Sequence, residues 1–151
     1  MLQVEGGGQT ADKYQIFDAT LTLGFSNERD GIQSVYSNPK MGSAMRLPRF
    51  APEAGYMTNW VKSTLQHEGE SLNEKREDQN YFFRVRTITD KYGKLISALY
   101  GKIHGEIDYS WPRGITFTYY LNSTPNDRNM EFAPARNLLT DLPSAAQVLD
   151  P

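Results

Sequence analysis

Charged and aromatic side chains recur at alternating positions between residues 82 and 122, a pattern that could bind a polar ligand. Alternate residues of a β-strand point to the same face of a sheet, so residues two apart can act together. Guanidinium and carboxylate groups beside flat rings are the groups with which proteins hold polar ligands such as sugars. We therefore predict ligand contact on one open sheet face by Arg84, Arg86, Tyr100, His104, Glu106 and Tyr120. The alternative is an ordinary solvated face with cross-strand pairs.

Two carboxylates on this face, Glu106 and Asp108, raise the alternative of a small glycan-active hydrolase. Two residues along a strand span about 7 Å, which fits the separation of the two acids in a glycosidase. The sequence contains no nucleophile elbow, phosphate-binding loop, metal-binding helix motif or dinucleotide fingerprint. Gly6-Gly7-Gly8 precedes the first predicted strand, so it is a linker rather than a phosphate cradle. We assign no catalytic residue and no cofactor, and we favour a protein that is not an enzyme.

Metal and thiol chemistry have little support in the sequence. The chain has no cysteine and only two histidines, His67 and His104, which are far apart in the sequence. The lack of cysteine excludes thiol catalysis, cysteine-based zinc sites and disulfides. Two histidines are too few to indicate a metal centre, so we assign no metal site.

The predicted ligand residues depend on a three-stranded antiparallel meander over residues 81–122. Two turns of the same chemistry, Asp90-Lys91-Tyr92-Gly93 and Trp111-Pro112-Arg113-Gly114, place glycine where a three-residue hairpin loop needs a left-handed residue. Counting back from these turns sets Val85 opposite Leu99 and Tyr109 opposite Phe117. Both registers give one apolar face, which we expect to be buried: Phe83, Val85, Leu99, Ile103, Ile107, Phe117, Tyr119 and Leu121.

Two glycines interrupt the long middle strand of this meander. Gly101 falls opposite Phe83, where an aromatic ring can fold over the bare backbone. Gly105 is expected opposite Leu121 and can mark a bulge, a feature that sometimes lies beside a functional site.

Outside the meander, alternating apolar and polar residues predict a strand over residues 14–25 and a shorter one over 32–36. We expect at most short strands over 43–47 and 130–132. Apolar residues at spacings of three and four predict one helix within 53–67, near 56–66, through Met57, Trp60, Val61, Thr64 and Leu65. Residues 66–80 are nearly all polar and are expected to be solvated.

These elements predict a mainly β fold, a single antiparallel β-sandwich or partly open barrel in which the helix near 56–66 closes one end. An α+β roll with that helix packed across the sheet is the alternative, and it would bury the predicted ligand face. Residues 1–12 are expected to be a flexible N-terminal segment, residues 13–142 one β domain and residues 143–151 a C-terminal tail. The 151 residues suffice for one domain with its own core.

Composition narrows the classes of partner and location. Sixteen Lys and Arg against eighteen Asp and Glu give a net charge of -2, so nucleic-acid binding is not expected. No apolar run is long enough for a membrane-spanning helix, and residues 1–10 lack the basic and apolar parts of a signal peptide. A cysteine-free chain suits an oxidising exterior, which favours an extracytoplasmic or secreted location.

The sequence therefore predicts a non-catalytic binding or assembly module. Its ligand would be a polar small molecule, a glycan or a protein partner, bound on the open sheet face. The alternatives are the glycan-active hydrolase described above and a structural subunit of a homo- or hetero-assembly. The sequence leaves the oligomeric state open.

Overall fold

The computed structural model describes residues 2–11, 14–37, 47–67, 70–71, 76–110, 114–139 and 141–148. Strands make up 55% of the chain and helix 4%, so the fold is mainly β, as predicted. In the described part of the chain no helix has the length and apolarity needed to cross a membrane. The predicted strand over 43–47 lies almost wholly outside the described residues, as do Trp111-Pro112-Arg113 and part of the polar stretch 66–80.

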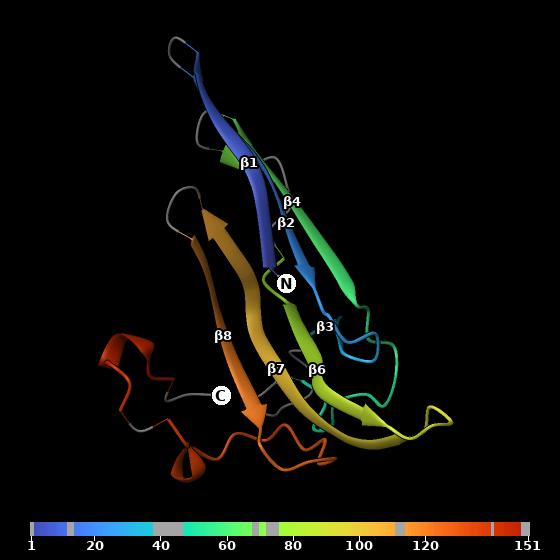
Figure 1. Cartoon of the computed structure of the whole chain (residues 1–151). Coiled ribbons are helices and arrows are strands. Elements are labelled where there is room, and N and C mark those ends of the chain that lie inside the picture. The colour runs from blue at the N-terminus through green and yellow to red at the C-terminus, as the bar shows by residue number, and fades with distance from the viewer. Residues whose placement is uncertain are drawn as a thin grey trace.

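Two four-stranded sheets build the molecule (Figure 1). Sheet A has the strand order β1 (Leu2–Ala11), β2 (Tyr14–Gly24), β4 (Asn59–His67) and β5 (Glu70–Ser71). Sheet B has the order β3 (Gly31–Tyr36), β6 (Gln79–Thr89), β7 (Leu95–Ser110) and β8 (Gly114–Asn122). Neighbouring strands are antiparallel in both sheets, and two short 3₁₀ helices follow, η2 (Pro134–Arg136) and η3 (Ser144–Ala146).

The segment just before β4 joins the two sheets at one corner. The amide of Phe25, just after β2, donates to the carbonyl of Thr58 at 2.9 Å and so extends the β2–β4 pairing of sheet A. Ile32 of β3 and Met57 exchange two backbone hydrogen bonds of 3.0 and 2.9 Å. The main core lies between the sheets and contains Leu21, Ile32, Trp60, Tyr81, Ile103 and Ile107.

The predicted helix near 56–66 is wrong, because the segment forms strand β4. Side chains alternate along it: Trp60 is 9% exposed and in the core, whereas Val61 is 58% exposed on the outer face. Aromatic and β-branched residues such as Trp60 and Val61 favour strands. The pair Trp60-Val61 is followed by Thr64-Leu65 four residues later, and this spacing resembles that of a helix. The α+β roll, which required that helix, is excluded with it.

The N-terminal segment also differs from the prediction. Residues 2–11 form strand β1, which pairs with β2 in a continuous antiparallel register from Leu2 opposite Leu23 to Ala11 opposite Tyr14. The glycine run lies inside this strand, so composition alone was a poor guide to its structure. Met130, in the predicted strand over 130–132, belongs to no strand; its amide donates to the Arg49 carbonyl, beside an isolated bridge from Asn129 to Phe50.

The meander is confirmed, with one hairpin register right and the other wrong. Val85 pairs with Leu99, and Gly93 and Gly114 have the expected positive φ, 80° and 100°. Tyr109 pairs with Ile115 instead of Phe117, and Ile103 pairs with Tyr119. Two extra residues of β7 between these pairs form a bulge at Gly105, whose φ is 79°. The observed register between β7 and β8 differs from the predicted one by an even number of residues. The apolar residues of β8 therefore stay on the predicted face but lie opposite other residues of β7.

Three residues of β8 that were expected in the core are exposed. Phe117, Tyr119 and Leu121 have exposed fractions of 44%, 49% and 40%. Ile103, on the neighbouring strand and the same face, is 5% exposed. In β8 it is Ile115 that packs against the core between the sheets, and the three exposed residues lie at the margin of this core.

Because Phe117 lies at the margin of the core, we expect Phe117→Ala to lose little stability. In dilute protein we expect a loss below about 1 kcal/mol, because the ring is already half in solvent. Phe82, which is fully buried, should lose about 3 to 5 kcal/mol when changed to alanine. Urea unfolding of both variants measures the difference, and equal losses would contradict this boundary of the core.

The reverse face of sheet B, expected to be open, is covered in its centre. A second core cluster lies there and contains Ala51, Phe82, Ala98, Tyr100 and Met130. Two chain segments hold this layer in place, since Ala51 and Arg128 share a backbone hydrogen bond of 2.8 Å, as do Met130 and Arg49. The proline-containing stretch near residue 50 thus acts as a cover for the sheet.

Candidate functional site

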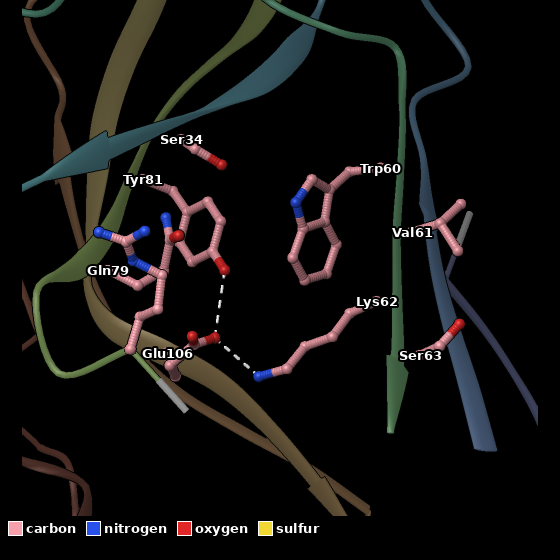
Figure 2. Close-up of a pocket in the computed structure, with 9 residues that line it drawn as sticks. Ser34, Trp60, Val61, Lys62, Ser63, Gln79, Tyr81 and Glu106 are labelled. Carbon is pink, nitrogen blue, oxygen red and sulfur yellow. Dashed lines mark hydrogen bonds and ion pairs between the residues drawn. The ribbon is translucent and has the colours of Figure 1, made fainter. Parts of the chain in front are cut away.

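A cleft of about 280 Å³ opens between the sheets, where β6 begins (Figure 2). Figure 2 shows Trp60 and Lys62 of β4 directed toward Tyr81 and Glu106 of sheet B. The side chains of Val61 and Ser63 point away from the cleft, on the other side of β4, although both residues belong to its lining. Among the described residues, the lining consists of Ser34, Trp60, Val61, Lys62, Ser63, Arg76, Gln79, Tyr81 and Glu106.

Two aromatic rings form the inner wall of the cleft. Trp60 and Tyr81 meet edge to face, with ring centroids 5.3 Å apart and planes at 84°. Such pairs contribute about 0.5 to 1.5 kcal/mol beyond the area they bury. Both rings also belong to the core cluster between the sheets, so this wall is held in place by packing on both sides.

A partly buried ion pair lies beside this wall. The Lys62 ammonium donates to Oε2 of Glu106 at 2.7 Å and to the carbonyl of Ile107 at 3.1 Å. The Lys62 and Glu106 side chains are 24% and 11% exposed. The Tyr81 hydroxyl donates to the same Oε2 at 3.3 Å. Burial, and then the Glu106 charge, raise the pKa of Tyr81, so its hydroxyl stays protonated and remains a donor.

The bulge in β7 explains why Glu106 reaches this cleft. Simple alternation would put Glu106 on the reverse face with Lys102. The left-handed Gly105 and the extra residues turn the chain, and the Glu106 carboxylate meets Lys62 of the opposite sheet. The Asn80 side-chain oxygen accepts the Gly105 amide at 2.9 Å, so the bulge leaves that donor satisfied. A bulge that redirects a side chain is common beside functional sites.

The other predicted ligand residues lie apart from Glu106. Tyr100 is 2% exposed and packs against Tyr56, at a centroid distance of 6.3 Å. Arg84 stacks over Tyr56 at 4.8 Å, and its guanidinium donates to the carbonyls of Arg29 and Glu53. Arg84 and Tyr100 are cross-strand partners that both contact Tyr56, and Tyr100 is buried.

Arg86 lies apart from the other predicted ligand residues, where the backbone of β6 is irregular. It adopts a left-handed conformation with φ of 55° at an irregularity in β6. The Asp30 carboxylate accepts the amides of Arg86 and Thr87 at 3.0 and 2.9 Å. This carboxylate satisfies the backbone donors that the irregular strand leaves unpaired, while the Arg86 residue is exposed.

Tyr120 and His104 lie near Lys102 on the reverse face. Lys102 is 1% exposed, and its ammonium lies 4.5 Å from the centroid of the Tyr120 ring. Tyr120 also packs edge to face against Phe132, at 5.1 Å. Partial burial and the Lys102 charge lower the pKa of His104, and burial lowers the pKa of Lys102 to about 8.

Lys102 should therefore make stability depend on pH. Its pKa is lower in the folded protein than in the unfolded chain, so the unfolded chain binds more protons between about pH 8 and 10.5 and stability rises with pH there. Lys102→Met should raise the free energy of unfolding at pH 7 by about 1 to 2 kcal/mol and lose most of that gain by pH 10. Urea titrations of the variant and wild type across this range measure it.

A control for this prediction is Lys94→Met, in the exposed hairpin between β6 and β7. It should leave stability within about 0.5 kcal/mol at every pH. A Lys102→Met effect that stays constant from pH 7 to pH 10 would mean that the lysine is not destabilised by burial.

Only Glu106 of the predicted ligand residues lies in the cleft, and sequence reasoning missed its neighbours. Trp60 and Lys62 were assigned to a helix, although their alternation with exposed Val61 and Ser63 is a strand signal. In the described residues no group of three acidic or histidine side chains is arranged to hold a metal ion.

The arrangement offers acceptors, donors and rings around one opening between two sheets. No family model, no curated protein and no solved structure matches this chain.

Proposed function

We propose that the protein is a non-catalytic binding module that takes a polar ligand, of the glycan class, in the cleft between its sheets. The observation that supports this is the ion pair of Lys62 and Glu106 beside an opening. Burying two charges is expensive, and apolar residues of the same size usually give equal or greater stability. A buried pair placed at an opening, and not within the packed core, is better suited to a ligand than to stability.

The chemistry of the lining supports this class of ligand. Lys62, Arg76 and Ser34 supply donors, while Glu106 and Gln79 supply acceptors, and Trp60 and Tyr81 supply rings. A molecule with many hydroxyl groups can bond to both kinds of polar group and pack its ring against the wall. A volume near 280 Å³ is at the lower end of ligand pockets and suits one sugar ring at the end of a chain.

The same lining favours binding over hydrolysis. Glycosidases of the usual kind place two carboxylates across the scissile bond. Among the described residues that line the cleft, Glu106 is the only carboxylate. Asp108, the second acid of the hydrolase alternative, is exposed outside that lining.

Blocking the cleft tests the proposal. Ser34 is exposed, and in Figure 2 it lies on the sheet B side of the cleft across from Trp60, so Ser34→Tyr should fill the opening without disturbing the core. Leu65→Tyr is the matched control, since Leu65 is also exposed but lies on the outer face of sheet A and outside the lining of the cleft. A glycan array should identify a ligand for the wild type, and titration calorimetry should measure its affinity.

Ser34→Tyr should weaken binding at least about tenfold, a change of about 1.4 kcal/mol, while Leu65→Tyr keeps the wild-type affinity. Both variants should unfold at wild-type urea concentrations. Equal affinity in the two variants would place the ligand elsewhere, and an array without any bound glycan would reject the ligand class.

A further inference from the structure

The outer edge of sheet B is formed by a strand that lacks the usual protection. β8 pairs with β7 on one side and with no described strand on the other. Its nine residues, GITFTYYLN, contain no charged residue and no proline, the two features that most often prevent an edge strand from pairing further. The edge strand β3 at the opposite side of the sheet has six residues, and the edge strand β5 of sheet A has two.

β8 also presents a row of exposed apolar side chains. Phe117, Tyr119 and Leu121 lie on one face of the strand and are 40% to 49% exposed. The Phe117 and Tyr119 rings lie 6.0 Å apart, so they form one continuous patch. A contiguous apolar patch on the edge strand of a sheet is typical of a surface that associates with another protein.

The sequence of β8 selects a second copy of itself as the partner. Opposite residues of an antiparallel pair point to the same face, so a twofold axis perpendicular to the sheet must lie between two copies of the same residue. An axis at Thr118 is the one that pairs all nine residues, Gly114 with Asn122 at the ends. It places Phe117 opposite Tyr119 of the second copy, and Ile115 opposite Leu121. Each apolar residue therefore meets a partner of its own kind.

Charge supports the same partner. A strand that pairs with itself about a twofold axis brings any charge near the axis close to an identical charge, which is unfavourable. β8 has no charge, so self-pairing meets no such repulsion. We propose that β8 pairs antiparallel with β8 of a second copy about Thr118, joining the two four-stranded sheets B into one sheet of eight strands.

A cysteine introduced at Thr118 tests this register, because the natural chain has no cysteine to interfere. Directly opposite residues of antiparallel strands have Cα atoms about 4.5 to 5.5 Å apart, within the range that a disulfide spans. T118C should therefore form a covalent dimer on mild oxidation. T116C is the matched control: it lies on the same face of the same strand, but would be opposite Tyr120 of the second copy.

We expect T118C to form covalent dimer at least about tenfold faster than T116C, because the two thiols of a T116C dimer would lie four residues apart along the paired strands. Equal rates would mean random collision, and faster reaction of T116C would mean another register; either result overturns the proposal.

Sedimentation of the unmodified chain provides a second test. The wild type should show a mass that rises with concentration toward that of a dimer. Tyr119→Lys, which places a charge next to Phe117 of the second copy, should remain monomeric at concentrations where the wild type associates. Val61→Lys, at a position 58% exposed on the outer face of sheet A, should associate as the wild type does. A wild type that is monomeric at every concentration, or association unaffected by Tyr119→Lys, would reject β8 as the interface.

Discussion

Replacing Gly101 by alanine should destabilise the protein by about 3 kcal/mol, although it adds only one methyl group. A Cβ built at this position would overlap the ring of Phe83 and lie 2.5 Å from the carbonyl oxygen of Tyr120. The ring could turn away, but the carbonyl belongs to the paired strand β8 and cannot move without breaking the ladder. Chemical denaturation followed by the fluorescence of the buried Trp60 would measure the loss.

Two further variants separate the causes of this loss. Gly105→Ala meets nothing within 4 Å, so it should cost only the strain of a left-handed alanine, about 1 kcal/mol. Gly101→Ala combined with Phe83→Leu should recover part of the loss, because the shorter side chain removes one of the two overlaps. A Gly101→Ala variant no less stable than Gly105→Ala would show that β7 and β8 can separate at little cost.

The second large effect is expected from Lys62→Met. The substitution leaves the Glu106 carboxylate, which is 11% exposed, without its ammonium partner. Removing one member of a buried ion pair typically costs about 3 to 5 kcal/mol, and the partial exposure of Lys62 puts our expectation near 2 to 3 kcal/mol. Urea unfolding at neutral pH measures this loss.

An exposed ion pair in the same protein is the control. Arg49 and Glu131 lie 3.2 Å apart with side chains 59% and 53% exposed, so Arg49→Met should cost less than about 1 kcal/mol. The double variant Lys62→Met, Glu106→Gln should recover most of the stability, because the unpaired charge is gone. If Lys62→Met costs no more than Arg49→Met, the ion pair does not hold the two sheets together.

The hairpin from β6 to β7 could be predicted from the sequence because local chemistry determines it. Oδ1 of Asp90 accepts the amides of Tyr92 and Lys94 at 2.8 and 2.9 Å, and Gly93 adopts the left-handed conformation that the turn needs. All of these groups lie within five consecutive residues. Val85 then falls opposite Leu99 by counting alone.

The register from β7 to β8 depends on residues far away in the sequence. The bulge at Gly105 is stabilised by the side chain of Asn80, and Lys62 of the other sheet holds Glu106. Counting from the second turn was already two residues out at Tyr109, which pairs with Ile115, and the bulge adds a further shift of two that nothing in residues 95–122 reveals. The covering of the reverse face also depends on residues distant in the sequence, because a stretch around Ala51 with little regular structure packs over Tyr100.

The candidate site was predicted only in part for a related reason. Glu106 was among the predicted ligand residues and lies in the cleft, but the face predicted for it was wrong. Trp60 and Lys62 were not considered, because their segment imitates a helix over one and a half turns. A cleft between two sheets is formed by strands that are distant in sequence, and alternation within each strand does not say which strands will face each other.

The chain crosses between the sheets three times, and this has a consequence for how the protein folds. β2, β3 and β4 alternate between the sheets, so Ile16 of β2 finds its partner His67 about fifty residues later. The strands β6, β7 and β8 are instead consecutive in the sequence, with only a few residues between one strand and the next. Loop closure favours contacts that are close in sequence. We therefore expect the meander to form early on the folding pathway and the pairing of β2 with β4 to be the slow step, during which unpaired strand edges are open to misassembly.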